Sequence, residues 1–134
     1  MSADLVLDLS ATATGLRSCL DRIMESCTRS KLPRDTISRL QIVVEELFSN
    51  TIKYGYGGEC ERPVRLRLQC SPRIELVYED AAPPFDPTAW QETAPPGALE
   101  GRIGRKGISL VLGMAESVRY ERLREGNRLT LRFA

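Results

Sequence analysis

Two polar residues have the types and the spacing that a metal-dependent enzyme needs. Glu46 and Asn50 are four residues apart in a segment whose apolar residues recur at helical spacing, so their side chains project from one helix face. An Asn amide oxygen is a suitable ligand for Mg²⁺, and a carboxylate one turn away could polarise an attacking hydroxyl. Lys53 is near the same face and could meet phosphate. The alternative is an ordinary solvated helix surface.

Asp80 is a second candidate, at the end of a segment in which Ile74, Leu76 and Tyr78 occupy alternate positions. This parity places its carboxylate on the inward face at the end of a strand. Burying a carboxylate without a donor is costly, so we expect it to be paired, at the surface or accepting a hydrogen bond from a ligand such as the amine of adenine. Alternatively, Asp80 forms the turn before the proline-rich segment that follows.

A third candidate is the run Gly104, Arg105, Lys106 and Gly107, which precedes the apolar residues 108–112. Glycines before a helix expose backbone N–H groups, and the positive end of the helix favours phosphate there. The same run is also compatible with a flexible loop before an ordinary helix. Taken alone, it does not distinguish these two interpretations.

The elements that must position these residues follow from periodicity. Alternation predicts strands near 5–9, 64–70, 74–80, 118–123 and 128–133, and spacings of three and four predict helices near 14–30, from 35 to about 54 and from about 107 to 116. Residues 81–104, rich in proline and glycine, read as a long loop, and such loops are often functional. Because strands and helices do not alternate, we expect an α+β fold, a two-layer α/β sandwich with helices on one face of the sheet.

Composition limits the function classes. The 134 residues, 42% of them hydrophobic, suit one domain over 1–134, and a formal net charge of +1 gives no global field toward nucleic acid or membrane. The absence of His excludes Ser-His and Cys-His catalysis and a histidine phosphoacceptor within this chain. The four cysteines show no close pairing, and we expect reduced thiols. With no apolar run of transmembrane length and no signal sequence, we expect a cytoplasmic location.

In order and spacing, the three candidates resemble the motifs of the GHKL, or Bergerat-fold, ATPases. Residues 46–56 look like the N box of the short anti-sigma-factor serine/threonine kinases in that superfamily. Residues 80–87 are similar to their D-x-G-x-P-F-[DN]-P segment, and residues 104–111 to their G-x-x-G-[IL]-x-[LIM]-[IV] segment. The resemblance covers nearly the whole chain and implies a Bergerat-type mixed sheet.

The resemblance also implies the role of each residue. Asn50 would hold Mg²⁺, Glu46 would be the catalytic base, and Asp80 would bind the adenine amino group of ATP. A lid would span residues 86–106. The remaining nucleotide contacts would be Lys53, Ala82, Phe85, Gly104, Arg105, Lys106, Gly107 and Ile108. Ala82 departs from the motif, which has glycine there, and its methyl group would crowd the adenine or restrict the backbone.

The implied function is a regulator that sequesters a sigma factor or similar target and uses Mg-ATP to phosphorylate Ser or Thr of an anti-anti-sigma antagonist of the STAS type. The alternative is a module that binds nucleotide but acts by docking alone, which Ala82 favours, whereas Glu46 and Asn50 favour the kinase. A third class is a structural domain with an empty site. We expect no direct nucleic-acid or membrane partner, and homodimerisation stays open. An isolated histidine kinase would need a further dimerisation and phosphoacceptor domain, for which 134 residues leave no room.

Overall fold

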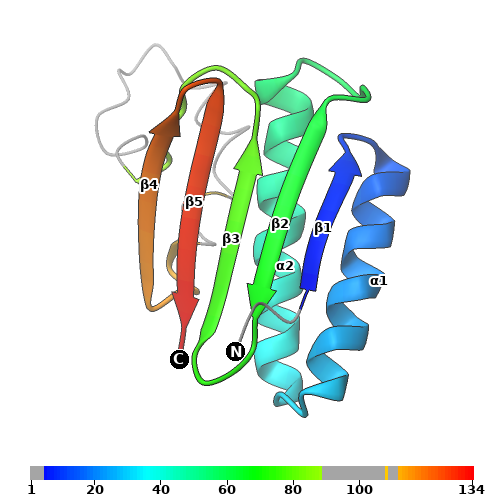
Figure 1. The fold of residues 1–134 in the computed structure, drawn as a ribbon, viewed down its shortest axis with the longest axis vertical. Coiled ribbons are helices and arrows are strands. Elements are labelled where there is room, and N and C mark those ends of the chain that lie inside the picture. Colours follow the sequence, from blue (N-terminus) through cyan, green and yellow to red (C-terminus); the bar gives the residue numbers. More distant parts are fainter. Residues whose placement is uncertain (1–4, 89–107, 109–111) are drawn as a thin grey trace.

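The chain forms a five-stranded sheet with a layer of helices on one face (Figure 1). The structure is a computed structural model, and it describes residues 5–88, 108 and 112–134. Its helices are α1 (Ala13–Arg29), α2 (Arg34–Asn50) and the π-helix η1 (Thr51–Gly55). Its strands are β1 (Leu5–Ser10), β2 (Pro63–Gln69), β3 (Ile74–Asp80), β4 (Ser117–Leu123) and β5 (Gly126–Phe133).

The strands lie in the order β1-β2-β3-β5-β4, and each neighbouring pair is antiparallel. The predicted two-layer α+β fold is confirmed, but the sheet is antiparallel at every described pairing instead of mixed. The pairs β2–β3 and β4–β5 are consecutive strands joined by short turns, which only an antiparallel arrangement allows. Between β1 and β2, two antiparallel helices return the chain to the end of the sheet where β1 finished (Figure 1), so β2 also runs antiparallel to β1.

The core lies between the helices and the inward face of the sheet. Leu66 and Leu68 on β2 and Leu76 on β3 are at most 1% exposed, as is Phe48 on α2. The predicted apolar stripe of the second helix is buried along its length, at Ile37, Leu40, Val44, Leu47, Phe48 and Thr51. Burying this apolar surface stabilises the fold and sets the rotation of α2 about its axis. That rotation decides where the polar residues of α2 can lie.

The opposite face of the sheet is polar and charged. A row of side chains with alternating negative and positive charge crosses this face. Its members are paired in register on neighbouring strands, in the order Asp8, Arg65, Glu79, Arg128 and Glu121. Arg65 Nε lies 2.8 Å from Asp8 Oδ1, and Arg128 Nε lies 2.7 Å from Glu79 Oε2. This face is therefore solvated, which matches the period-two pattern of a sheet with one buried side.

The end of α2 departs from the predicted helix. The α-helical part stops at Asn50, and Thr51–Gly55 continue as a π-helical turn, in which the Tyr56 N–H donates to the Thr51 carbonyl at 2.7 Å. A π-turn shifts the faces on which the following side chains lie, and such turns are frequent at functional sites. Two glycines follow shortly after this turn and end the helical conformation, with φ of 74° at Gly57 and 144° at Gly58.

The segment between β3 and β4 is described only in part. Residues 81–88 form irregular loop and turn, in agreement with the predicted loop, whose remaining residues lie outside the described part of the chain. Ile108 and Leu112 are helical, but residues 113–116 form turns and bends, so the helix predicted to reach 116 ends earlier. No helix among the described residues is long and apolar enough to span a membrane.

Candidate functional site

A pocket lies where the C-terminal end of α2 meets the end of β3. Its walls come from α2, η1, β3, β5 and the loop after β3. The residues that line it are Leu47, Asn50, Thr51, Tyr54, Gly55, Tyr78, Asp80, Ala82, Pro83, Pro84, Phe85, Pro87, Ile108, Asn127 and Leu129. The structure thus brings together Asn50, Asp80, Ala82, Phe85 and Ile108 of the predicted site. Glu46 and the exposed Lys53 are not among the described residues that line this pocket.

The Asp80 carboxylate is held by donors from three parts of the chain. Its Oδ2 accepts a hydrogen bond from the Thr51 hydroxyl of η1 at 2.8 Å. Its Oδ1 accepts from Asn127 Nδ2 of β5 at 2.9 Å and from the Ala82 backbone N–H at 3.2 Å. A carboxylate oxygen offers about two acceptor positions. These contacts therefore use both positions of Oδ1 and leave one on Oδ2, as far as the described residues show.

A buried chain of hydroxyl groups supports the Thr51 contact. The Tyr78 hydroxyl lies 2.6 Å from Thr51 Oγ1, and both hydroxyls are also near the Leu47 carbonyl, at 3.2 Å and 3.1 Å. Burial raises the pKa of Tyr78 well above its ordinary value, so the phenol keeps its proton. Each hydroxyl has one proton and a carboxylate only accepts. The consistent arrangement is that Tyr78 donates to Thr51 and Thr51 donates to Asp80.

Asn127 connects the β4–β5 hairpin to the same carboxylate. Its Oδ1 accepts from the Tyr120 hydroxyl at 2.6 Å and from the Phe85 backbone N–H at 3.2 Å. Its Nδ2 donates to Asp80 and to the Pro83 carbonyl, the latter at 3.0 Å. Donors surround the oxygen and acceptors surround the nitrogen, which fixes the orientation of the amide. The loop after β3 is therefore anchored to β5.

Asn50 has an unused acceptor. Its Nδ2 donates to the Glu46 carbonyl at 2.9 Å, while its Oδ1 is buried and accepts no hydrogen bond from a described residue. A buried amide oxygen without a donor is costly, so this atom is suited to a ligand such as a cation. No group of three or more His, Cys, Asp or Glu within the described ranges could hold a metal by itself.

Ala82 is accommodated by a glycine opposite it. The residue is 3% exposed, and a Cβ added to Gly55 would lie 2.9 Å from the Ala82 methyl group. Real side chains do not approach so closely, so the methyl fits only because Gly55 has none. The Ala82 methyl group, which the glycine of the resembled motif lacks, thus fills space in the pocket wall next to η1.

Four of the predicted nucleotide contacts, Gly104, Arg105, Lys106 and Gly107, lie outside the described residues. Ile108 is described, and it is 1% exposed and lines the pocket. Of the predicted lid at 86–106, the structure describes residues 86–88.

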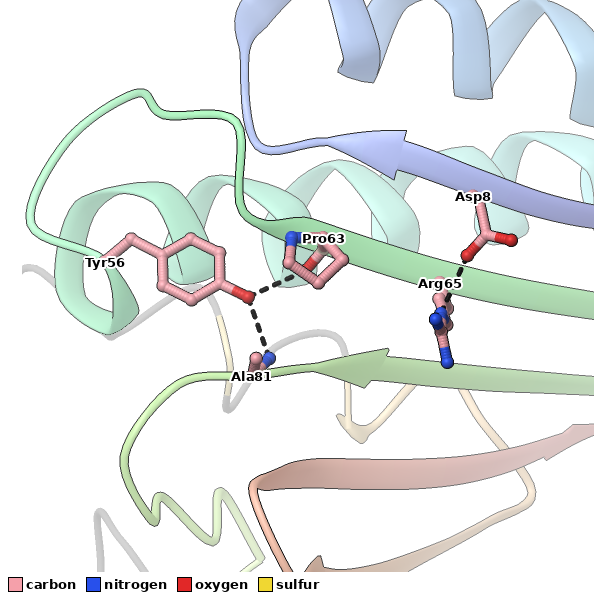
Figure 2. Close-up of polar contacts among 5 residues, drawn as sticks. All are labelled: Asp8, Tyr56, Pro63, Arg65 and Ala81. Atoms are coloured by element: carbon pink, nitrogen blue, oxygen red, sulfur yellow. Dashed lines mark hydrogen bonds and ion pairs between the residues drawn. The ribbon is translucent and has the colours of Figure 1, made fainter.

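Sequence reasoning missed several residues that shape the site. Thr51, Tyr78 and Asn127 are among them, although polar groups at inward positions are a signal for buried partners. Tyr56 is another: its hydroxyl accepts the Ala81 N–H and donates to the Pro63 carbonyl, each at 2.7 Å (Figure 2). Ala81 is 25 positions from Tyr56, so no local pattern indicates this contact.

The geometry can be compared with known proteins. Residues 9–133 match the family of histidine kinase-like ATPase domains. Among solved structures, the chain is similar to the crystal structure of the RsbU and RsbW domains of Rv1364c from Mycobacterium tuberculosis, with a TM-score of 0.65 and 14% identity over 96% of this chain. The chain spans 31% of that protein's length, and at this identity the likeness shows the fold alone. No curated protein sequence matches. By the family match over nearly its whole length, the chain belongs to the histidine kinase-like ATPase domain family.

Proposed function

We propose that the chain binds Mg-ATP in this pocket and phosphorylates Ser or Thr of a small STAS-type antagonist, in competition with its sequestration of a sigma factor or similar target. The observation that carries the nucleotide assignment is that one pocket contains the buried Asn50 amide oxygen, which has no partner among the described residues, and the Asp80 carboxylate, whose acceptor capacity those residues use only in part. Family membership supports nucleotide binding. The motif resemblance supports the kinase and its partners.

Asp80 would recognise the base. The donors already in place leave acceptor capacity on Oδ2, which suits the exocyclic amine of adenine. A base with a carbonyl oxygen at that position would place an acceptor against an acceptor, at an unfavourable free energy. The apolar residues of the pocket, among them Phe85 and Ile108, would contact the faces of the ring.

Asn50 and Glu46 would act at the phosphate end. Asn50 Oδ1 would hold Mg²⁺, which neutralises charge on the phosphates during transfer. Glu46 lies one turn earlier on α2. As the antagonist's hydroxyl oxygen bonds to the γ-phosphorus and the bond to the leaving ADP breaks, the Glu46 carboxylate would accept the hydroxyl proton. Lys53, Arg105, Lys106 and the N–H groups near Gly107 are proposed phosphate contacts.

The proposal is tested by calorimetry with Mg-ATP and by transfer of labelled phosphate to a STAS-type protein. Asp80→Asn should weaken nucleotide binding by about a hundredfold, because the amide presents a donor to the adenine amine. Glu46→Gln keeps the shape but removes the basicity, so binding should persist while transfer falls by roughly a hundredfold or more.

The matched control is Glu45→Gln, which removes the same charge one position away on an exposed part of α2 and should change neither measurement. Absence of Mg-ATP binding to the parent protein at millimolar concentration would refute the site. Undiminished transfer by Glu46→Gln would refute the assignment of the base.

A second candidate is a module that binds its target without transferring phosphate. Its specific support is the Ala82 methyl group, which lies in the pocket wall against Gly55. Under this alternative the parent binds its partner and transfers no phosphate to any antagonist, and Ala82→Gly increases nucleotide affinity. Under the kinase proposal, transfer is measurable in the parent.

A further inference from the structure

The ladder between β2 and β3 ends at the pair Val64 and Asp80. In the same register, the next pair would be Pro63 and Ala81. Proline has no N–H, so it cannot donate the ladder hydrogen bond that the Ala81 carbonyl would receive. Other groups are therefore needed as hydrogen-bond partners of the Ala81 backbone, at the point where the chain leaves β3 and enters the pocket wall.

Two side chains supply those groups. The Tyr56 hydroxyl lies between the Ala81 N–H and the Pro63 carbonyl, 2.7 Å from the donor nitrogen and 2.7 Å from the acceptor oxygen (Figure 2). Arg62 Nη2 donates to the Ala81 carbonyl at 2.7 Å. Because a hydroxyl is inserted where a direct backbone bond would form, β2 and β3 are held apart at this end. The loop that begins with Ala81 is thereby directed away from β2.

Tyr56 is itself tied to the helix that bears Asn50. It follows η1 directly, and its N–H donates to the Thr51 carbonyl at 2.7 Å. The Arg62 guanidinium lies 4.5 Å from the centre of its ring, which is a cation–π contact. Burial raises the pKa of Tyr56, so the phenol stays protonated and can both donate and accept.

Ala81 stands between Asp80 and Ala82, and the Ala82 N–H is one of the donors to the Asp80 carboxylate. A shift of the Ala81 peptide would therefore move both the carboxylate and its donor. We propose that Tyr56 is a positioning residue for the base of the nucleotide, because its hydroxyl holds the end of β3 at a fixed place relative to the end of α2. This inference rests on the proposed nucleotide site.

The test is Tyr56→Phe in the full chain, with dissociation constants for Mg-ATP and for Mg-inosine triphosphate, whose base has a carbonyl in place of the amine. The ring and its contact with Arg62 remain, but the Ala81 N–H and the Pro63 carbonyl lose their partner. We expect the Kd for ATP to rise by about tenfold and the preference for ATP over the inosine nucleotide to fall by a similar factor. A purely structural role would lower the melting temperature and leave that preference unchanged.

The matched control is Asp8→Asn, which breaks the ion pair with Arg65 on the opposite face of the sheet (Figure 2) and should leave both dissociation constants unchanged. Should Tyr56→Phe fold poorly, Arg62→Met removes the bond to the Ala81 carbonyl and should lower the preference in the same direction. An unchanged preference in the folded variants overturns the inference. A parent protein without any preference for ATP overturns the proposed base recognition itself.

Discussion

Asn127 is the residue on which the hydrogen bonds of the pocket converge. It joins Asp80, the Phe85 N–H and the Tyr120 hydroxyl through one buried amide. Such a network is stable only while every buried group keeps a partner, because an unpaired polar atom in a low-dielectric interior is costly. The chemistry of the pocket therefore depends on a residue that no ligand needs to touch.

Asn127→Asp tests this dependence with almost no change in shape. The substitution replaces the donor 2.9 Å from Asp80 Oδ1 with a carboxylate oxygen. Two carboxylates at this separation repel, and the carbonyl of Pro83 loses its donor. We expect the free energy of unfolding, measured with urea at pH 7, to fall by about 3 kcal/mol.

Tyr120→Phe is the control for this prediction, since it removes one hydrogen bond to Asn127 Oδ1 without adding charge. Its cost should be about 1 kcal/mol under the same conditions. Equal stability of Asn127→Asp and the parent at pH 7 would show that the amide is not essential to the network.

At the scale of elements, periodicity predicted most of the fold. The strands and the first two helices are found within a few residues of their predicted positions, because burial on one face imposes period two on a strand and 3.6 on a helix. The same rule correctly placed Asp80 on an inward position at the end of β3. Asn50 and Asp80 both line the pocket.

What periodicity could not predict are features that depend on contacts between distant segments. The π-turn of Thr51–Gly55 contains no residue that forbids an α-helix, so its sequence does not distinguish the two. The antiparallel sheet depends on how the segments return, which residue types do not encode locally. Tyr56 meets Ala81 across 25 positions, and such a pairing has no local signature.

The contact between η1 and the loop after β3 gives a prediction at this scale. Gly55 does not have a positive φ, so its backbone conformation is open to alanine. The higher helix propensity of alanine would by itself stabilise this helical turn by up to about 1 kcal/mol. The new Cβ would instead meet the Ala82 methyl at 2.9 Å, and we expect a net loss of about 2 kcal/mol in urea unfolding. In an Ala82→Gly background the same change should be neutral or stabilising. Additive effects of the two changes would show that the methyl groups do not meet.

At the scale of the whole molecule, the pocket is continuous with the core. Leu47, Tyr78, Ile108 and Leu129 belong both to the pocket wall and to the hydrophobic cluster between sheet and helices. A ligand that binds only the folded state stabilises it, so occupation of the pocket would raise the stability of this entire core. The core also contains Cys19 of α1, which is fully buried, and none of the chain's four cysteines, all in the described part, forms a disulfide.

Cys19 makes the stability of the whole fold depend on alkaline pH. Burial raises the pKa of its thiol from 9.0 to about 12, so between these values the unfolded chain releases a proton that the folded chain retains. The contribution is fully present below pH 9.0 and is lost as the pH rises toward about 12, with a slope of about 1.4 kcal/mol per pH unit. Tyr78, whose pKa burial also raises, should add to the loss above pH 10.0. Urea unfolding between pH 8 and 11 measures the slope. Cys19→Ala should reduce the slope by the contribution of one ionising group, whereas equal slopes for the two proteins would show that Cys19 ionises without unfolding.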